Sequence, residues 1–121
     1  MLNQFSRTQL LLGPDAMESL YGKKVAVFGI GGVGGYVCEA LVRSGIGSFD
    51  LIDDDKVCLT NLNRQIIATR KTVGKYKAEV MRDRTLEIDP YVYHIEQSVF
   101  GLEYHRFTRE SYRKMMSEAG E

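Results

Sequence analysis

The chain has 121 residues, of which 44% are hydrophobic and 26% charged, and its formal net charge is zero. This length suffices for one domain with its own core but is short for a complete doubly wound enzyme. A zero net charge excludes a basic footprint over the whole chain of the kind that argues for nucleic-acid binding. No apolar run approaches the length of a membrane span or of a signal-peptide core. We therefore predict a cytoplasmic protein that does not contact a membrane.

Residues 1–23 are expected to form a helical arm. A short helix in residues 1–12 carries apolar side chains that would dock before the sheet begins, and a glycine-proline pair ends it. A second short helix is predicted to begin with a capping box formed by Asp15 and Glu18. Arg7 lies in this arm, and from the residues alone a solvated charge is favoured for it.

The next stretch predicts a nucleotide-binding β-α-β unit. An apolar run at residues 24–28 ends in glycines and a helical pattern follows, which is typical of a buried parallel strand, a tight turn and a helix. Gly29 would allow the sharp turn off the strand. Gly31 and Gly32 would leave no Cβ between the backbone amides and a phosphate, and Gly34 would let the helix pack closely on the strand. The N-terminus of the helix would present N–H groups and a positive dipole end to an anion.

The helix and the strand after it complete this unit. Gly45 is expected to end the helix as a left-handed cap, and Phe49–Ile52 to form the second strand. Asp53 follows that strand, where a carboxylate can accept hydrogen bonds from ribose hydroxyls. Cys38 in the helix is expected to be a small buried hydrophobe, and both cysteines to be free thiols outside any metal site. The helix is expected to bury an apolar face at spacings of three and four, made of Val33, Val37, Ala40 and Leu41.

Residues 53–65 form a second functional element in this interpretation. Carboxylates, amides and an arginine crowd this loop, which follows the carboxyl end of a strand, where open α/β sheets bind ligands. A solvated connection with Asx turns is the alternative. Between Arg64 and Arg84 seven basic residues stand against two acidic ones, an excess that suits a polyphosphate or an RNA backbone. For Arg82 and Arg84 a solvated helix face is an equal alternative.

The fold class predicted is α/β, a Rossmann-like parallel sheet with helices on both faces, limited to about its first three strands. A helix is expected at about residues 74–88 and a third, edge strand at about residues 91–98. Residues 24–100 would then be a nucleotide-binding half-domain, and residues 101–121 a polar helical tail capped by Thr108.

Five sequence blocks, taken in order, resemble the ThiF/MoeB/HesA family, bacterial relatives of ubiquitin-activating enzymes, and within it the tRNA threonylcarbamoyladenosine dehydratases. The resemblance covers roughly residues 3–90. A lone glycine turn is weak as a signature, but the ordered set is highly specific. The blocks are Phe5-Ser6-Arg7, Gly29-Ile30-Gly31-Gly32-Val33-Gly34, Leu51-Ile52-Asp53-Asp54-Asp55-Lys56-Val57, Asn61-Leu62-Asn63-Arg64-Gln65 and Val73-Gly74-Lys75-Tyr76-Lys77.

The resemblance implies that the nucleotide is ATP, with Mg²⁺, and that an acyl group is adenylated. Asp53 would hold the ribose, and Asp55 would sit near the phosphates. The nucleotide-binding set implied is the four glycines of the turn with Asp53, Asp55, Asn61 and Gln65.

The catalytic residues implied are Arg64 and Lys77 on the polyphosphate, and Arg7 reaching the γ-phosphate from the partner subunit of a homodimer. The acyl group would be the threonyl carboxylate of threonylcarbamoyladenosine in tRNA, and the adjoining Arg70 and Lys71 could serve that tRNA. The alternative is the C-terminal carboxylate of a ubiquitin-like sulfur carrier, with a sulfur-carrier or cysteine desulfurase system protein as partner.

The chain also departs from the family pattern. Family members continue into a fourth strand with a metal-binding Asp-x-x-Asp motif, and no such motif follows Phe100 here. We therefore expect a fragment or natural truncation whose strand at residues 25–28 is a bare edge, dimeric or poorly stable alone. This leaves open an inactive nucleotide-binding or interaction module. An NAD-dependent oxidoreductase would share the glycines and Asp53 but leaves Arg64 and Lys77 unexplained.

Overall fold

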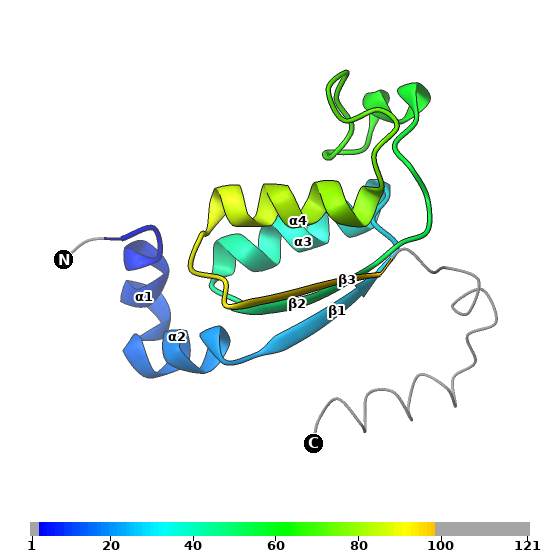
Figure 1. Ribbon diagram of the computed structural model, residues 1–121. Helices are drawn as coiled ribbons and strands as arrows, with labels where there is room; N and C mark the ends of the chain where they lie inside the picture. Colours follow the sequence, from blue (N-terminus) through cyan, green and yellow to red (C-terminus); the bar gives the residue numbers. More distant parts are fainter. Residues whose placement is uncertain (1–2, 99–121) are drawn as a thin grey trace.

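The computed structural model describes residues 3–98 and shows a parallel sheet of three strands (Figure 1). The strands are β1 (Lys24–Phe28), β2 (Ser48–Ile52) and β3 (His94–Ser98), in the order β1-β2-β3. Each strand pairs with its neighbour in parallel. The predicted Rossmann-like sheet is thus confirmed, and β1 and β3 are the edges of the sheet within these residues.

Two helices connect the strands and pack on one face of the sheet. Helix α3 (Gly32–Ser44) follows β1, and α4 (Lys77–Ile88) precedes β3. Figure 1 shows both helices on the same side of the sheet. This is expected, since the two right-handed crossovers both step along the sheet in the same direction and so place their helices on the same face. The prediction also placed helices on the second face of the sheet. No helix covers that face within residues 3–98.

The core lies between these helices and the sheet. Phe49 and Leu51 of β2 are fully buried there, as are Cys38 and Val42 of α3 and Met81 of α4. Removing a large apolar side chain from water contributes about 1.5–3 kcal/mol, so this layer supplies much of the stability of the described part. Cys38 is fully buried, which confirms the prediction of a small buried hydrophobe, and this burial raises the pKa of its thiol to about 12.

The predicted buried face of α3 is wrong at three of its four residues: Leu41 is partly buried against the core, but Val33, Val37 and Ala40 are exposed. Val33 and Val37 are 80% and 41% exposed, and the residues that α3 buries are Gly35, Cys38 and Val42. The helix is apolar on nearly every side, so its hydrophobic spacing did not single out one face. The contact of its first turn with the end of β1 sets the rotation.

The helical arm is present but begins and packs differently from the prediction. It consists of α1 (Ser6–Leu12) and α2 (Pro14–Tyr21). The capping box is wrong, because Pro14 already occupies the first turn of α2 after Gly13, with no side-chain cap, and proline suits that position. The expected docking of the first helix is also wrong, since α1 buries no residue and its three leucines are exposed.

Contacts at the amino ends of the strands attach α2 to the sheet. The Tyr21 hydroxyl donates a hydrogen bond to the Tyr91 carbonyl oxygen at 2.7 Å, and the Tyr21 and Tyr93 rings meet edge to face with centroids 5.1 Å apart. Gly47 lies directly beneath, where a Cβ would stand 2.2 Å from the Tyr21 carbonyl oxygen. Only glycine fits there.

The remaining elements follow the predictions closely. Helix α4 begins three residues later than expected and ends at Ile88, with Asp89 as its C-terminal cap before a proline. Strand β3 also begins three residues later than expected, at His94. Residues 99–100 of the predicted third strand and the tail at residues 101–121, with its Thr108 cap, lie outside the described residues. None of the helices in residues 3–98 has the length and apolar character that crossing a bilayer requires.

Candidate functional site

The glycine turn joins β1 to α3 at the carboxyl end of the sheet. Gly29 has a φ of 90°, and its N–H donates to the Ile52 carbonyl oxygen at 2.8 Å. A Cβ on Gly34 would lie 1.7 Å from the Gly29 carbonyl oxygen, so α3 begins against the turn as closely as a backbone can. Gly31 caps α3 without a side chain, and no atom lies within 4 Å of a Cβ built on Gly32. There is thus free space beside the first turn of α3, and the N–H groups and positive dipole end of a helix N-terminus suit an anion.

Asp53 connects this turn to the polar loop. One carboxylate oxygen accepts the N–H of Ile30 at 2.6 Å, and the other accepts the N–H of Asp55 at 2.7 Å. Each carboxylate oxygen has a second lone pair, so Asp53 can still accept a hydrogen bond from a hydroxyl group of a ligand. The position predicted for ribose binding thus also fixes the geometry between the two functional elements.

A short antiparallel clasp brings Lys77 to the acidic loop. Lys56 forms a β-bridge with Tyr76, and the N–H of Lys77 donates to the Asp55 carbonyl oxygen at 3.0 Å. The Lys77 side chain is 9% exposed, and its ammonium lies 4.0 Å from an Asp55 carboxylate oxygen. The Lys56 ammonium lies over the Tyr76 ring, 5.0 Å from the centroid. The clasp therefore places two residues 22 positions apart in the chain at one site.

The 3-10 helix Leu59–Asn63 positions the amides and the arginine of the loop. Asn61 is buried, and its side-chain oxygen accepts the N–H of Cys58 at 2.8 Å, so that oxygen is engaged in the turn itself. Arg64 is exposed and donates to the Asn63 side-chain oxygen at 2.9 Å. These are contacts within the loop, and they hold the arginine at its surface.

Gln65 lies between the loop and the glycine turn. It is 7% exposed, and its amide nitrogen lies 3.7 Å from the position of a Cβ on Gly31. Its side-chain oxygen is buried and accepts no hydrogen bond from the described residues. A buried acceptor without a donor is costly, so this atom is available to a ligand that enters beside the turn.

Three consecutive carboxylates provide oxygen donors at the same edge. One ligand atom from each of Asp53, Asp54 and Asp55 can lie within 4.8 Å of the other two. Hard oxygen ligands of this kind fit Mg²⁺, which takes one or two carboxylates together with substrate phosphates.

Arg7 is the predicted site residue that the fold keeps apart. It is exposed in α1, and Figure 1 shows α1 and α2 at the end of the sheet opposite the loop of residues 53–76. One chain therefore gathers the glycines, Asp53, Asp55 and Lys77, with the 3-10 helix beside them, but not Arg7.

Comparison with known proteins now identifies the family. The ThiF family model matches residues 5–114. The chain belongs to the ThiF family. The match runs well past residue 90, so the family resemblance extends further than the expected residues 3–90.

Individual ThiF family relatives are similar over most of this chain. The tRNA threonylcarbamoyladenosine dehydratase of Bacillus subtilis is 42% identical over 114 residues, which are 94% of this chain and 42% of the relative. The molybdopterin-synthase adenylyltransferase of Escherichia coli is 37% identical over 78 residues, 64% of this chain and 31% of the relative. The crystal structure of the E. coli dehydratase TcdA in complex with ATP superimposes with a TM-score of 0.81 and 40% identity, over 94% of this chain and 44% of that one. The chain thus spans less than half the length of these relatives.

Two features of this ThiF family site were not predicted. The clasp between residues 55–57 and 74–77 has no local pattern, and only Gly74, with a φ of 90°, marks the turn that allows it. Arg84, counted with the basic cluster, instead donates to both carboxylate oxygens of Glu39 on α3, at 2.5 and 3.0 Å. The hydrogen bonding with Arg84 holds the pKa of Glu39 below its ordinary value. The charge of Arg84 is therefore not available to a phosphate.

Proposed function

We propose that this chain binds ATP at the carboxyl end of the sheet and adenylates a carboxylate. Lys77 carries this proposal. Its charge is buried at the N-terminus of α4, where the helix dipole disfavours a cation, and its carboxylate neighbour, Asp55, is 4.0 Å away and 71% exposed. A buried charge with so weak a partner is costly, and such a departure from local stability rules is expected at a functional site. An anion bound beside Lys77 would offset the cost.

The glycine turn complements Lys77. The open N–H groups of α3 and the Lys77 ammonium can contact different oxygens of one polyphosphate, while Asp53 accepts a ribose hydroxyl. Gln65 offers its free side-chain oxygen to an N–H or O–H donor of the ligand. Mg²⁺, held by oxygens of the Asp53–Asp55 run, would neutralise part of the phosphate charge. Structures of the E. coli relative are in complex with ATP and with AMP, which supports an adenylate nucleotide over a redox dinucleotide.

The chemistry explains why cations and backbone amides dominate this site. An oxygen of the substrate carboxylate attacks the α-phosphorus, the bond to the bridging oxygen of pyrophosphate breaks, and an acyl adenylate remains. Both the approach of two anions and the departing pyrophosphate require positive charge aimed at the phosphate oxygens. Lys77, Arg64 and the N–H groups of α3 supply it. No protein nucleophile takes part in this step.

The substrate proposed is threonylcarbamoyladenosine in tRNA. The carbamoyl group closes a ring on the activated threonyl carbonyl, and AMP leaves, so that the nucleoside loses one water overall. Dehydratases of Bacillus subtilis and Escherichia coli are 42% and 49% identical to this chain over the matched residues, and the free thiols suit the cytoplasm, where tRNA is modified. Activation of a sulfur-carrier C-terminus is the alternative, supported by the adenylyltransferase relatives.

We further propose a homodimer, in which Arg7 from one subunit reaches the γ-phosphate bound by the other. Arg7 is exposed and lies at the end of its own chain opposite the glycine turn, so it can serve a nucleotide only in another copy. The exposed Leu10, Leu11 and Leu12 of the same helix are apolar surface that such a contact would cover.

The test measures ATP binding by calorimetry and ATP–pyrophosphate exchange with tRNA that carries threonylcarbamoyladenosine. Lys77→Ala and Arg64→Ala should each lower exchange by at least about tenfold, whereas Lys23→Ala, an exposed lysine at the other end of the sheet, should change nothing. Full exchange in both alanine variants would refute the proposal. ATP binding without exchange in the unsubstituted chain would select the inactive nucleotide-binding module instead.

A further inference from the structure

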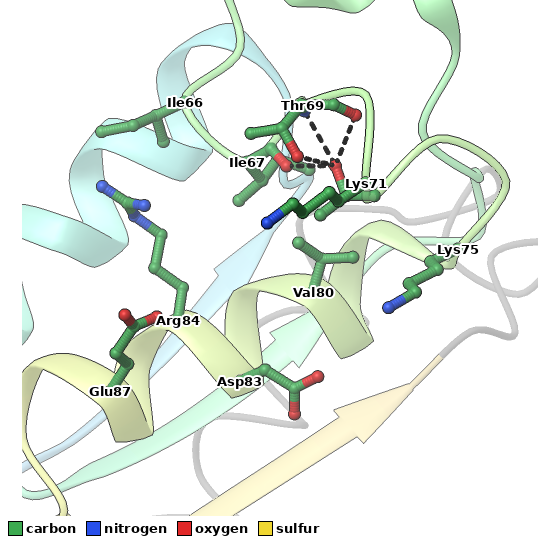
Figure 2. Close-up of a pocket in the computed structure, with 10 residues that line it drawn as sticks. Ile66, Ile67, Thr69, Lys71, Lys75, Val80, Asp83, Arg84 and Glu87 are labelled. Carbon is green, nitrogen blue, oxygen red and sulfur yellow. Dashed lines mark hydrogen bonds between the residues drawn. The ribbon is translucent and has the colours of Figure 1, made fainter.

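A separate cavity of about 290 Å³ lies between α4 and the loop of residues 66–75 (Figure 2). Ile66, Ile67 and Val80 form its apolar floor. Its volume lies just below the lower limit of about 300 Å³ for ligand sites. It lies on the side of α4 that carries Arg84, and the ATP site proposed above does not include any of its lining residues.

One rim of the cavity carries two unpaired cations. Figure 2 shows the ammonium groups of Lys71 and Lys75 directed toward the cavity, and neither forms an ion pair with any residue from 3 to 98. The other cation in the lining, Arg84, is engaged with Glu39. The rim of Lys71 and Lys75 is therefore the part of the cavity that can bind an anion.

The loop that carries these lysines is held in shape by Thr72. The Thr72 hydroxyl accepts the N–H of Thr69 at 2.8 Å and donates to the Ile67 carbonyl oxygen at 2.8 Å. The N–H of Gly74 donates to the Val57 carbonyl oxygen at 2.9 Å. A loop anchored at both its middle and its end can present a preformed site.

Two acids of α4, Asp83 and Glu87, also line the cavity. In Figure 2 Glu87 lies beside Arg84, and Asp83 lies on the same side as Lys75. Asp83 is thus a hydrogen-bond acceptor in the lining near the lysine rim. A bare phosphate would not use it, whereas a nucleobase edge with N–H donors would.

We propose that this cavity takes one unpaired nucleotide of an RNA substrate, with its phosphate on Lys71 and Lys75, its base on the apolar floor and a base N–H on Asp83. Single-stranded RNA is recognised in this way, by bases that are splayed out and hydrogen-bonded on their edges. The proposal rests on the proposed function, because it assigns part of the tRNA site.

The position of the cavity suits a nucleotide near the one being modified. Lys75 lies in the cavity rim and Lys77, two residues on, lies in the ATP site, while Ile66 of the floor directly follows Gln65 beside the glycine turn. An RNA strand that lies across residues 75–77 would connect the cavity with the ATP site. Its modified adenosine would meet ATP while a neighbouring nucleotide occupies the cavity.

Fluorescence anisotropy on the full chain tests the lysine rim, with a labelled RNA stem-loop that contains threonylcarbamoyladenosine in its loop. Lys71→Ala and Lys75→Ala should each weaken binding by about tenfold and reduce the salt slope by about 0.7. Lys23→Ala is the matched control and should do neither. ATP affinity should stay unchanged in all three variants. Equal behaviour of the three variants toward RNA, or a loss of ATP binding in the two rim variants, would overturn the proposal.

Asp83→Asn separates nucleotide recognition from attraction by charge alone. Removing a carboxylate should strengthen RNA binding if only electrostatics acts, and Glu79→Gln, on an exposed acid of α4 outside the cavity, measures that effect. We expect Asp83→Asn to weaken binding instead, by about threefold, because a charged acceptor for a base N–H is replaced by a weaker, neutral amide oxygen. Stronger binding in Asp83→Asn would refute the base contact. Failure of ATP binding in the unsubstituted chain would refute the proposed function and leave the RNA result independent.

Discussion

At the amino ends of the strands, α2 packs against the sheet through Tyr21, whose hydroxyl and ring both meet partners within the chain. At the carboxyl ends, Lys77 is buried with one distant carboxylate, and the side-chain oxygen of Gln65 is buried with no donor among residues 3–98. The contrast lies in these residues: Tyr21 finds its partners inside the molecule, whereas Lys77 and Gln65 keep polar atoms without a close partner among the described residues. We expect the amino end to serve stability and the carboxyl end to bind a ligand.

Alanine at one glycine from each end should separate stability from binding most clearly. In Gly47→Ala the new Cβ meets the Tyr21 backbone oxygen at 2.2 Å, and backbone cannot move aside cheaply, so the free energy of unfolding should fall by about 3 kcal/mol. In Gly32→Ala the Cβ meets nothing within 4 Å, so stability should hold while ATP affinity falls. Thermal denaturation and calorimetry measure the two effects. Equal destabilisation by both substitutions would show that the ends do not differ in this way.

Asp53→Asn tests whether the carboxyl end also depends on its own polar contacts. The carboxylate accepts two backbone N–H groups, one on each oxygen, and an amide nitrogen would face one of them with a second donor. The free energy of unfolding should fall by about 1–3 kcal/mol. Asp15→Asn, an exposed carboxylate in α2, should change it by less than about 0.5 kcal/mol. A chemical denaturation series that finds the two variants alike would contradict the bridging role.

The Glu39–Arg84 pair joins α3 to α4 between the two ends, and it gives a pH dependence with a definite sign. The hydrogen bond from Arg84 lowers the pKa of Glu39 from 4.5. The stabilisation that the pair gives the folded state is therefore complete above pH 4.5, and it is lost as the pH falls through the lower, folded-state pKa of Glu39. Because the Arg84 side chain is 35% exposed, we expect about 1 kcal/mol or less. Glu39→Gln should remove this part of the acid dependence in melts, whereas Glu18→Gln should retain it.

Sequence patterns predicted the β-α-β unit because each of its parts has a local cause. A short apolar run, a glycine turn and a polar loop after a strand are all set by neighbouring residues. The rotation of α3 and the partner of Arg84 were missed because contacts between distant elements decide them. Gly34 reaches the Gly29 backbone, and Glu39 lies 45 residues before its arginine. In the site, Asp53 could be placed from its spacing, but the clasp that brings Lys77 to Asp55 could not.

The two cysteines test, with the smallest expected effect, whether the loop at the carboxyl end is accessible while the core is not. Cys38 is buried, with a pKa raised to about 12, while Cys58 is exposed at the start of the 3-10 helix that carries Asn61 and Arg64. Since the thiolate is the reactive form, an alkylating reagent should label Cys58 alone in the native chain and both thiols in denaturant. Mass spectrometry counts the labels, and Cys58→Ser provides the control. If ATP orders this loop, saturating ATP should slow the labelling of Cys58, and an unchanged rate would place the nucleotide away from Asn61 and Arg64.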